Sequence, residues 1–475
     1  MLLRSVLHRR FRSDAGDEFV YVANSAAILA LDPLASATVA AFADADGRDD
    51  ATWLADQADR DAATATLHDL IDLGVIRPVD EAPVPRATLP PMPFPLATLV
   101  LNVTNRCNLS CTYCYEYGAD RVADDAAAGR PKMDDATARQ AIDFLLRSSA
   151  DRPQVSITFF GGETLLNFPA IRAAVEYAEE RARQARKRVH YSLTTNATLL
   201  TEDVVDFLTQ HRFGITVSID GDRDQQDRHR TFQKGVGSFD VIAPRIRHLL
   251  ATNRARGGRA IGARVTLTHG AAPVPETFRF LTGELGFDEV GFAPVTAGLG
   301  RAYALGELGY ERLLREFGEL AEDYVAAALR GERLGFANLD DLLRELHQGV
   351  QKAHPCGAGL GLLGVSTEGE LGLCHRFVES RSHGVGSLAA GIDEGARSAF
   401  LERAHVDRKP DCQACFARPL CAGGCYHEAH VRYGDATRAN LHYCEWIRGF
   451  VDLGLRCYGR ILSRNPQFFA RFAAS

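Results

Sequence analysis

The distribution of cysteine is the feature that most constrains this chain. Three of its eleven cysteines lie within eight residues, in the stretch "CNLSCTYC" that begins at Cys107, and seven more lie between Cys356 and Cys444. None occurs from residue 115 to 355, and Cys457 stands alone near the end. An odd number of clustered cysteines does not fit a disulfide framework. In a reducing compartment such clusters indicate metal binding or catalysis.

The bulk properties exclude several classes of function. The chain has 475 residues, of which 46% are hydrophobic and 24% charged, which is typical of a globular protein with two or three domains. A net charge of −7 argues against a general nucleic-acid binder, because that function needs a positive field. The Arg-rich opening lacks the cleavage site of a signal peptide, and no apolar run is long enough to cross a membrane. We therefore expect a cytoplasmic protein with no nucleic-acid or membrane partner.

Residues 1–85 are expected to form a small domain of their own. The Arg-rich opening is interpreted as a solvated or pairing segment. "EFVYVANSAAILALD" predicts two short strands with a turn at Asn24-Ser25, and the amphipathic stretches that follow, ending near Gly74, predict helices. This arrangement suggests a winged-helix-like module. The Pro-rich stretch 86–96 predicts a linker.

Residues 97–309 alternate short apolar runs with longer amphipathic stretches. This pattern predicts an α/β domain in which a parallel sheet is covered by helices. Six strands suit a partial (β/α)6 barrel better than a full barrel of eight. The predicted strands are "LATLVLNVT", "VSITFFGG", "HYSLTTN", "GITVSIDG", "IGARVTLT" and "EVGFAPV". Cys107, residues 161–163, Asn196 and Asp220 each follow a strand, so we expect them to converge on one mouth of the sheet.

The remainder of the chain divides into three segments. Residues 310–350 predict a helical connector, and residues 451–475 predict a closing helix. Residues 351–450 are rich in glycine and cysteine with short strands, so metal is expected to supply the stability that a small apolar core lacks. Cys457, on the closing helix, is interpreted as a buried small hydrophobic residue.

Three cysteines in one loop suit an iron–sulfur cluster with one open iron. A cluster of four irons needs a ligand at each iron, so three thiolates leave one iron free to bind a cofactor through an amine and a carboxylate. A zinc site completed by a distant ligand is the alternative. Closed zinc sites favour two closely spaced pairs of cysteines, which this loop lacks.

The spacing C-x3-C-x2-C, with Tyr113 before the third cysteine, resembles that of radical S-adenosylmethionine (SAM) enzymes. The resemblance implies a [4Fe–4S] cluster on Cys107, Cys111 and Cys114 that cleaves SAM to a 5′-deoxyadenosyl radical. It also implies a set of SAM contacts at Tyr113, Gly161, Gly162, Glu163, Ser192, Asn196 and Ser218. Glu163 is expected at the SAM amino group, and the two glycines allow close backbone approach. For each polar residue alone, a local hydrogen bond at a strand end is an equally good explanation.

The seven later cysteines resemble the SPASM domain of radical SAM enzymes that modify peptides. By that domain's pattern, one auxiliary [4Fe–4S] cluster is held by Cys412, Cys415, Cys421 and Cys444, and a second by Cys356, Cys374 and Cys425. Three clusters are therefore expected in all. The second auxiliary cluster is one ligand short, and either the substrate or a residue outside the pattern fills the vacancy. Zinc ribbons are the alternative, but the unequal spacing favours clusters.

Longer stretches of the sequence restrict the resemblance to one family of these enzymes. "TNRCNLSCTYCYEYGAD", "HPCGAGLGLLGVST" and "RPLCAGGCYHEAHVRYGD" resemble the radical SAM maturases of quinohemoprotein amine dehydrogenase. This resemblance implies thioether crosslinks between cysteine sulfur and a side-chain methylene carbon of Asp or Glu in the small γ subunit of that dehydrogenase. It also implies an electron donor such as flavodoxin or ferredoxin. The N-terminal module resembles modules that bind leader peptides by strand addition, and a stabilising cap is the alternative.

The reaction also needs a group that removes the proton from the thiol of the substrate cysteine. Asp220, at the expected mouth, and His375, beside Cys374, are the candidate bases, and ligation to the incomplete cluster is another way to activate the thiol. Two other functions are considered. One is a maturase of a different peptide, such as a ribosomal natural-product precursor or a sulfatase. The other is a zinc-binding scaffold without catalysis.

Overall fold

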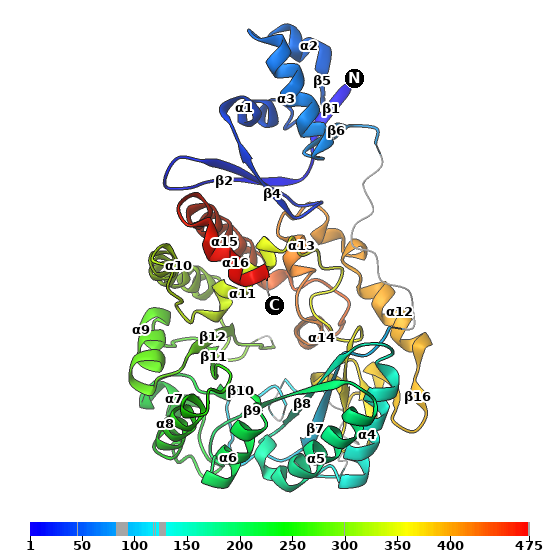
Figure 1. The fold of residues 1–475 in the computed structure, drawn as a ribbon, viewed down its shortest axis with the longest axis vertical. Helices are drawn as coiled ribbons and strands as arrows, with labels where there is room; N and C mark the ends of the chain where they lie inside the picture. The colour runs from blue at the N-terminus through cyan, green and yellow to red at the C-terminus, as the bar shows by residue number, and fades with distance from the viewer. Residues whose placement is uncertain are drawn as a thin grey trace.

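The fold is built on one large mixed sheet with a smaller N-terminal unit docked on top (Figure 1). The computed structural model describes residues 1–44, 46–81, 94–116, 118, 120–122, 130–298 and 300–473. Most of the predicted linker 86–96 lies outside the described residues, as do Tyr117 and Ala119 of the string "EYGAD". In the described parts of the chain, no helix has the length and apolar character needed to cross a membrane.

Six parallel strands follow one another in chain order and form one half of the large sheet. They are β7 (Thr98–Thr104), β8 (Gln154–Gly161), β9 (Arg188–Thr195), β10 (Gly214–Ser218), β11 (Gly262–Leu267) and β12 (Glu289–Pro294). Along β8, Val155, Ile157 and Phe159 are buried on one face, whereas Ser156, Thr158 and Phe160 point to the other. The prediction of six parallel strands in this region is confirmed.

Helices cover the apolar face of this half. They are α4 (Asp135–Ser148), α5 (Phe168–Gln184), α6 (Glu202–Gln210), α7 (Arg223–His229), α8 (Phe239–Ala255) and α9 (Val274–Arg279). In α4 the buried residues Ala138, Ala141, Ile142 and Leu145 recur at the spacing of one helical face. Asp134 caps the start of that helix by accepting a hydrogen bond from the Thr137 backbone N–H at 2.8 Å. The side chains on the other face of the strands, such as Ser156 and Thr158 of β8, therefore point away from these helices.

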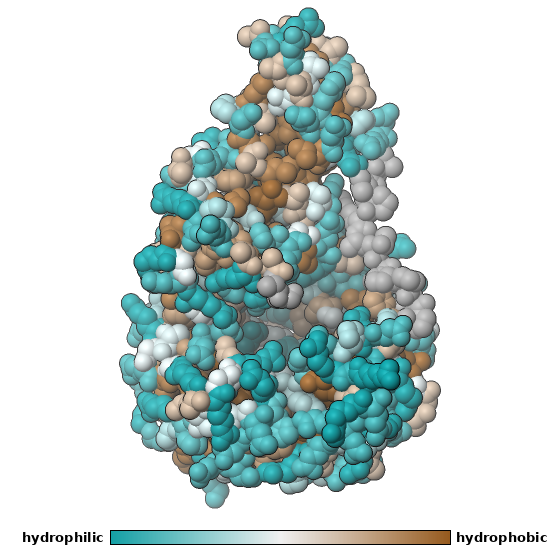
Figure 2. All heavy atoms as spheres, in the orientation of Figure 1, coloured by the Kyte–Doolittle hydropathy of each residue, from teal (hydrophilic) through white to brown (hydrophobic). Residues whose placement is uncertain are grey.

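The cysteine-rich region continues the same sheet. Strand β13 (Leu362–Val365) pairs in parallel with β7, and β14 (Glu370–Gly372), β15 (Gly384–Ser387) and β16 (Gly391–Ile392) extend the sheet antiparallel. Strand β13 lies beside β7, and Cys374, which follows β14, is near enough to the cysteine loop that it and Cys114 both act to raise the pKa of Tyr115. Figure 2 shows the surface hollowed between the parallel sheet and the C-terminal elements.

Helices make up most of the remaining C-terminal structure. They are α10 (Glu307–Leu329), α11 (Ala337–His347), α12 (Glu394–Ala404), α13 (Arg418–Cys421), α14 (Tyr426–Tyr433), α15 (Cys444–Arg464) and α16 (Ala470–Ala473). The helical connector predicted at 310–350 corresponds to α10 and α11. The boundary predicted after residue 450 falls inside α15, because the closing helix already begins at Cys444. Cys457 is 1% exposed within the main core, as its interpretation as a buried small residue requires.

The N-terminal unit has its own hydrophobic core between two small sheets and three helices. Its elements are β1 (Leu2–Ser5), β2 (His8–Arg12), β3 (Glu18–Val22), β4 (Ala27–Leu31), α1 (Pro33–Ala41), β5 (Arg48–Asp49), α2 (Asp50–Ala55), α3 (Arg60–Asp72) and β6 (Ile76–Pro78). The Arg-rich opening pairs as β1 and β2, so it is a pairing segment. Gly459 of α15 leaves room for Phe11 and Phe19 where the unit docks.

Candidate functional site

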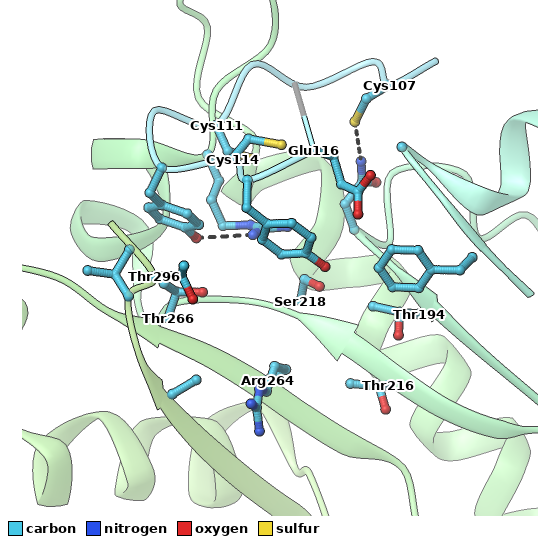
Figure 3. Close-up of a pocket in the computed structure, with 18 of the residues that line it drawn as sticks. Cys107, Cys111, Cys114, Glu116, Thr194, Thr216, Ser218, Arg264, Thr266 and Thr296 are labelled. Carbon is cyan, nitrogen blue, oxygen red and sulfur yellow. Dashed lines mark hydrogen bonds between the residues drawn. The ribbon is translucent and has the colours of Figure 1, made fainter. Parts of the chain in front are cut away.

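The three cysteines of the first loop open on a cavity of about 430 Å³ at the ends of the parallel strands (Figure 3). We call this space the central cavity. Its walls come from the cysteine loop, the glycine turn after β8, the ends of β9 to β12 and the segment after β14. Cys107, Cys111 and Cys114 lie at one end of the view, and Thr216 and Arg264 lie at the other. The expected convergence of strand ends is therefore present for Cys107, Gly161, Gly162 and Asn196.

Backbone hydrogen bonds fix the cysteine loop against the chain that follows β10. The Ser110 N–H donates to the Thr231 carbonyl at 2.8 Å, and the Thr112 N–H donates to the His229 carbonyl at 3.1 Å. Within the loop, the Cys107 sulfur accepts from the Leu109 N–H at 3.4 Å. The three thiols are thus presented by a backbone that is already held in place.

The environment of the loop raises the pKa of its thiols. Burial raises the pKa of Cys107 to about 12, and the Glu163 carboxylate and the two neighbouring cysteines add to the effect. Burial also raises the pKa of Cys111, although the Arg230 guanidinium opposes it. Thiols with a raised pKa remain protonated near neutral pH unless a metal displaces the proton.

The glycine turn lies directly against the cysteine loop. Gly161 has φ +135°, and a Cβ there would sit 2.3 Å from the Thr104 carbonyl oxygen. A Cβ on Gly162 would sit 2.3 Å from the Arg106 carbonyl oxygen and 3.0 Å from the Cys107 nitrogen. Both positions therefore exclude any larger residue, because backbone atoms fill the space. The two glycines allow the close approach that the sequence predicted, with the cysteine loop as the neighbouring backbone.

Glu163 is held by hydrogen bonds from the protein itself, and its expected role at a ligand's ammonium group stays a prediction. Its carboxylate is buried behind the cavity wall and accepts hydrogen bonds from Thr195 Oγ1 at 2.7 Å, the Asn196 N–H at 2.7 Å and the Leu165 N–H at 3.1 Å. Burial raises the pKa of this carboxyl group, and these hydrogen bonds oppose the rise. Glu163 therefore fixes the turn after β9, and with it Asn196.

The other predicted SAM contacts divide into two groups. Tyr113, Asn196 and Ser218 line the central cavity, whereas Ser192 does not and instead pairs its hydroxyl with Thr158 Oγ1 at 2.9 Å. Thr194, two residues beyond Ser192 on the same face of β9, lines the cavity in its place. The period of two along a strand predicts that the residue nearer the strand end reaches the mouth. Asn196 also approaches Cys107 Sγ, with its Nδ2 at 3.9 Å.

The two candidate bases lie behind the cavity wall. Asp220 is buried, accepts a hydrogen bond from the Tyr113 hydroxyl and accepts another from the Thr266 N–H at 3.1 Å. Burial raises its pKa, and the Arg230 guanidinium opposes the rise. Asp220 therefore positions Tyr113 and does not reach into the cavity. The expected role of this carboxylate as a base stays a prediction.

His375 is also enclosed by protein. Its ring centroid lies 4.3 Å from that of Phe160, and Phe160 rather than His375 lines the cavity. Burial and the adjacent Arg376 lower the pKa of His375 to about 3. The imidazole is therefore neutral at physiological pH and is separated from the cavity by an aromatic ring.

Charged cavity residues were missed by the sequence analysis. They are Glu116, Arg230, Arg264 and Arg376. Arg376 stacks on Tyr115, with its Cζ 3.8 Å from the ring centroid. Burial raises the pKa of Glu116 to about 7. Of these four, only Arg264 could have been identified from the sequence. It lies within the apolar strand "IGARVTLT", and a charge on a strand of this kind needs either a partner or a cavity.

The seven later cysteines gather in two groups. Burial raises the pKa of Cys421 to about 12, and Cys444, Cys412 and Cys415 add to the rise. In the same way, burial raises the pKa of Cys374 to about 12, and Cys425 and Cys356 contribute. Cysteines that act on one another in this way lie near one another. The two groups contain the same four and the same three cysteines as the SPASM pattern.

The ten clustered cysteines form two sets of three and one set of four, and these numbers suit iron–sulfur clusters. None of the eleven cysteines forms a disulfide. In the described ranges, no three Cys, His, Asp or Glu side chains converge closely enough to hold one metal ion. A four-iron cluster places each thiolate on a separate iron, so its ligands surround the cluster instead of meeting at a point. Thiols arranged in separate groups of three and four fit that requirement.

Comparison with known proteins defines the class of the central domain. Residues 101–254 match the model of the Radical SAM superfamily. They include the cysteine loop, the glycine turn and strands β8 to β10. The chain therefore contains a radical SAM domain.

Most of the chain is similar to anaerobic sulfatase-maturating enzymes. It is 25% identical over 411 residues to the serine-type enzyme of Klebsiella aerogenes, a match that covers 82% of this chain and 94% of that protein. The cysteine-type enzyme of Clostridium novyi is 22% identical over 371 residues, covering 75% of this chain and 94% of that protein. An uncharacterized protein of Methanocaldococcus jannaschii is 37% identical over 123 residues, but the match spans only 38% of its length.

Solved structures share the fold. The structure "Native anSMEcpe with bound AdoMet" aligns with a TM-score of 0.63 at 19% identity and covers 80% of this chain and 100% of its own. Streptococcus suis SuiB bound to precursor peptide SuiA aligns with a TM-score of 0.52 at 15% identity and covers 94% of this chain and 100% of its own. At these identities the alignments establish the fold.

Proposed function

We propose that this chain is a radical SAM enzyme that matures a peptide or protein. The observation that carries the proposal is the loop Cys107–Cys114, whose three thiols open on the central cavity opposite polar strand ends. A [4Fe–4S] cluster bound there supplies, with SAM, a 5′-deoxyadenosyl radical. Cys107, Cys111 and Cys114 are proposed to hold three of its irons. Gly162, Asn196 and Ser218 are proposed to bind SAM from the cavity wall.

The later cysteines are proposed to hold two auxiliary clusters. Cys412, Cys415, Cys421 and Cys444 complete one set of four ligands, and Cys356, Cys374 and Cys425 provide three. Oxidation of a substrate after hydrogen abstraction releases one further electron, which these clusters are proposed to receive. An external donor such as flavodoxin or ferredoxin is proposed to supply the reducing electron.

Two observations support a peptide as the substrate. The matched relatives are named for maturing sulfatases, and SuiB, whose structure holds a precursor peptide, aligns with nearly the whole chain. The N-terminal unit is proposed to be a peptide-recognition module. Its short sheet β2–β3–β4 has edges suited to strand addition, which gives affinity through main-chain hydrogen bonds.

Two proteins are candidates for the specific substrate. The resemblance to maturases of quinohemoprotein amine dehydrogenase favours thioether crosslinks between Cys and Asp or Glu in the small γ subunit. The curated relatives favour oxidation of a Ser or Cys in a sulfatase. At the level of whole-chain similarity, the second candidate has the better support.

One experiment separates these possibilities. The chain is purified without oxygen, its iron is measured, and it is co-expressed with the γ subunit or with a sulfatase before mass spectrometry. About twelve irons per chain, and loss of two hydrogens per crosslink together with loss of alkylatable cysteine, would support the thioether reaction. A product that reacts with a hydrazide reagent would support an aldehyde in a sulfatase. A colourless zinc protein would refute the proposal and leave the scaffold alternative.

A further inference from the structure

Arg264 is a cation in the wall of the central cavity to which the proposed chemistry gives no role. It lies in β11, where Ala263, Val265 and Leu267 are buried on one face, so the alternation turns Arg264 and Thr266 toward the cavity. Across the sheet, Arg264 is level with Ser218 of β10 and Gly291 of β12.

The neighbouring strand makes room for the guanidinium group. A Cβ placed on Gly291 would sit 3.5 Å from Arg264 Nη1 and 3.8 Å from the Cβ of Ala337, the first residue of α11. The guanidinium therefore extends over a glycine and toward the start of a helix, where the helix dipole also favours an anion.

The charge of Arg264 has no counterpart among the described residues. No carboxylate there forms an ion pair with it, and no acceptor there receives a hydrogen bond from it. Burial and the Arg376 guanidinium lower its pKa, and Asp341, the carboxylate that acts in the opposite sense, is already paired with Arg344 at 2.9 Å. The Arg264 side chain is exposed to the cavity, so an incoming carboxylate meets a cation that no described carboxylate already neutralises.

The other two cavity arginines are compensated within the chain. Arg230 donates to the Tyr113 hydroxyl at 3.1 Å, and Asp220 acts on it electrostatically. Arg376 stacks on the Tyr115 ring and donates to Thr296 Oγ1 at 3.4 Å. Among these three arginines, only Arg264 has neither a side-chain hydrogen bond nor a ring contact within the described residues.

We propose that Arg264 binds a carboxylate of the peptide substrate, namely the side chain of an Asp or Glu. This inference rests on the proposed function. The planar guanidinium matches a carboxylate with two parallel hydrogen bonds. Figure 3 shows Arg264 and Thr216 at the end of the cavity away from Cys107, Cys111 and Cys114, so a carboxylate on Arg264 leaves the cysteine end to the cofactor. The carboxylate of SAM is the other source of the same chemistry, and the test separates the two.

The test measures how the reconstituted holoenzyme, in the presence of SAM, binds two synthetic segments of whichever co-expressed candidate, the γ subunit or the sulfatase, it is found to modify. One segment keeps a single acidic residue, and the other carries the matching amide. Wild type is expected to bind the acidic segment about ten- to a hundred-fold more tightly, which is the range for a hydrogen-bonded charge. Arg264→Gln is expected to bind the two segments equally with an unchanged Kd for SAM, and Arg264→Lys to keep part of the discrimination.

Arg247→Gln, an exposed arginine on the outer helix α8, should leave discrimination intact, and unchanged iron content in Arg264→Gln shows that the variant is folded. Discrimination that survives in Arg264→Gln, or a loss of SAM affinity instead, would overturn the proposal. So would a wild type that cleaves SAM but prefers neither segment, and in that case the proposed function stands. A wild type that cannot cleave SAM at all would refute both.

Discussion

Replacing Gly162 by alanine tests how closely the glycine turn and the cysteine loop depend on each other. The new Cβ would sit 2.3 Å from the Arg106 carbonyl oxygen, whereas ordinary contacts begin at 3.4 Å. Either the turn or the loop must therefore move by about 1 Å, because the obstacle is backbone that no rotamer change can relieve. The adjoining residue on the loop is Cys107.

The magnitude follows from that displacement. Overpacking of this kind costs about 1–3 kcal/mol of unfolding free energy, and a misplacement of about 1 Å at a reactive site lowers its rate by about 100-fold. We expect Gly162→Ala to have a melting temperature a few degrees lower, less iron at the loop, and SAM cleavage reduced by about two orders of magnitude.

The assay pairs thermal unfolding with iron content and with 5′-deoxyadenosine formation under a chemical reductant. Gly318, in helix α10, provides a matched control because a Cβ there meets no atom within 4 Å. Gly318→Ala should stabilise the protein by about 0.5–1 kcal/mol and leave SAM cleavage unchanged. Wild-type iron content and cleavage rate in Gly162→Ala would show that the close approach has no role in building the site.

Three further predictions address the clusters and the electrostatics. Cys111→Ser should lose about four of about twelve irons and all SAM cleavage, as measured by iron assay and product chromatography; retention of all the iron would contradict the ligand assignment. Cys457→Ser should keep the full iron content but lower the melting temperature, since it places a hydroxyl in the core where the thiol is 1% exposed; loss of iron would instead make Cys457 a ligand. Burial acts to raise the pKa of Asp120, but hydrogen bonds led by that of Arg301 at 2.8 Å leave it below its ordinary value. Wild type should therefore have a larger unfolding free energy than Asp120→Asn. This difference should reach its full size above a pH of about 4 and decrease as acid protonates the carboxylate. A difference that does not change with pH would contradict this.

Much of the central domain follows from its sequence pattern. Apolar runs such as "VSITFFGG" have the length and β-branched content of buried strands, and the amphipathic stretches between them bury one face as predicted. The residues at and just after the strand ends form much of the cavity wall, as predicted, because parallel strands end at the same edge of a sheet.

Other features depend on contacts that the sequence does not display. Strand β13 pairs with β7 across more than 250 residues of chain, and no local pattern indicates such a partner. The Arg-rich β1 and β2 have few β-branched residues and become strands because they pair with β6 and β3. The hydrogen-bond partners of Glu163 and Asp220 could not be predicted for a related reason: donors to each buried carboxylate lie on other strand ends.

The most direct test of the central claim is deuterium transfer from the substrate to the cofactor. The reconstituted enzyme is incubated with SAM, a reductant and a co-expressed candidate substrate whose side-chain methylene groups carry deuterium. The account predicts 5′-deoxyadenosine that contains deuterium, in step with the mass loss of the substrate, and neither product with Cys111→Ser. A substrate that changes mass without deuterium in 5′-deoxyadenosine, or no cleavage of SAM by the iron-loaded wild type, would contradict it.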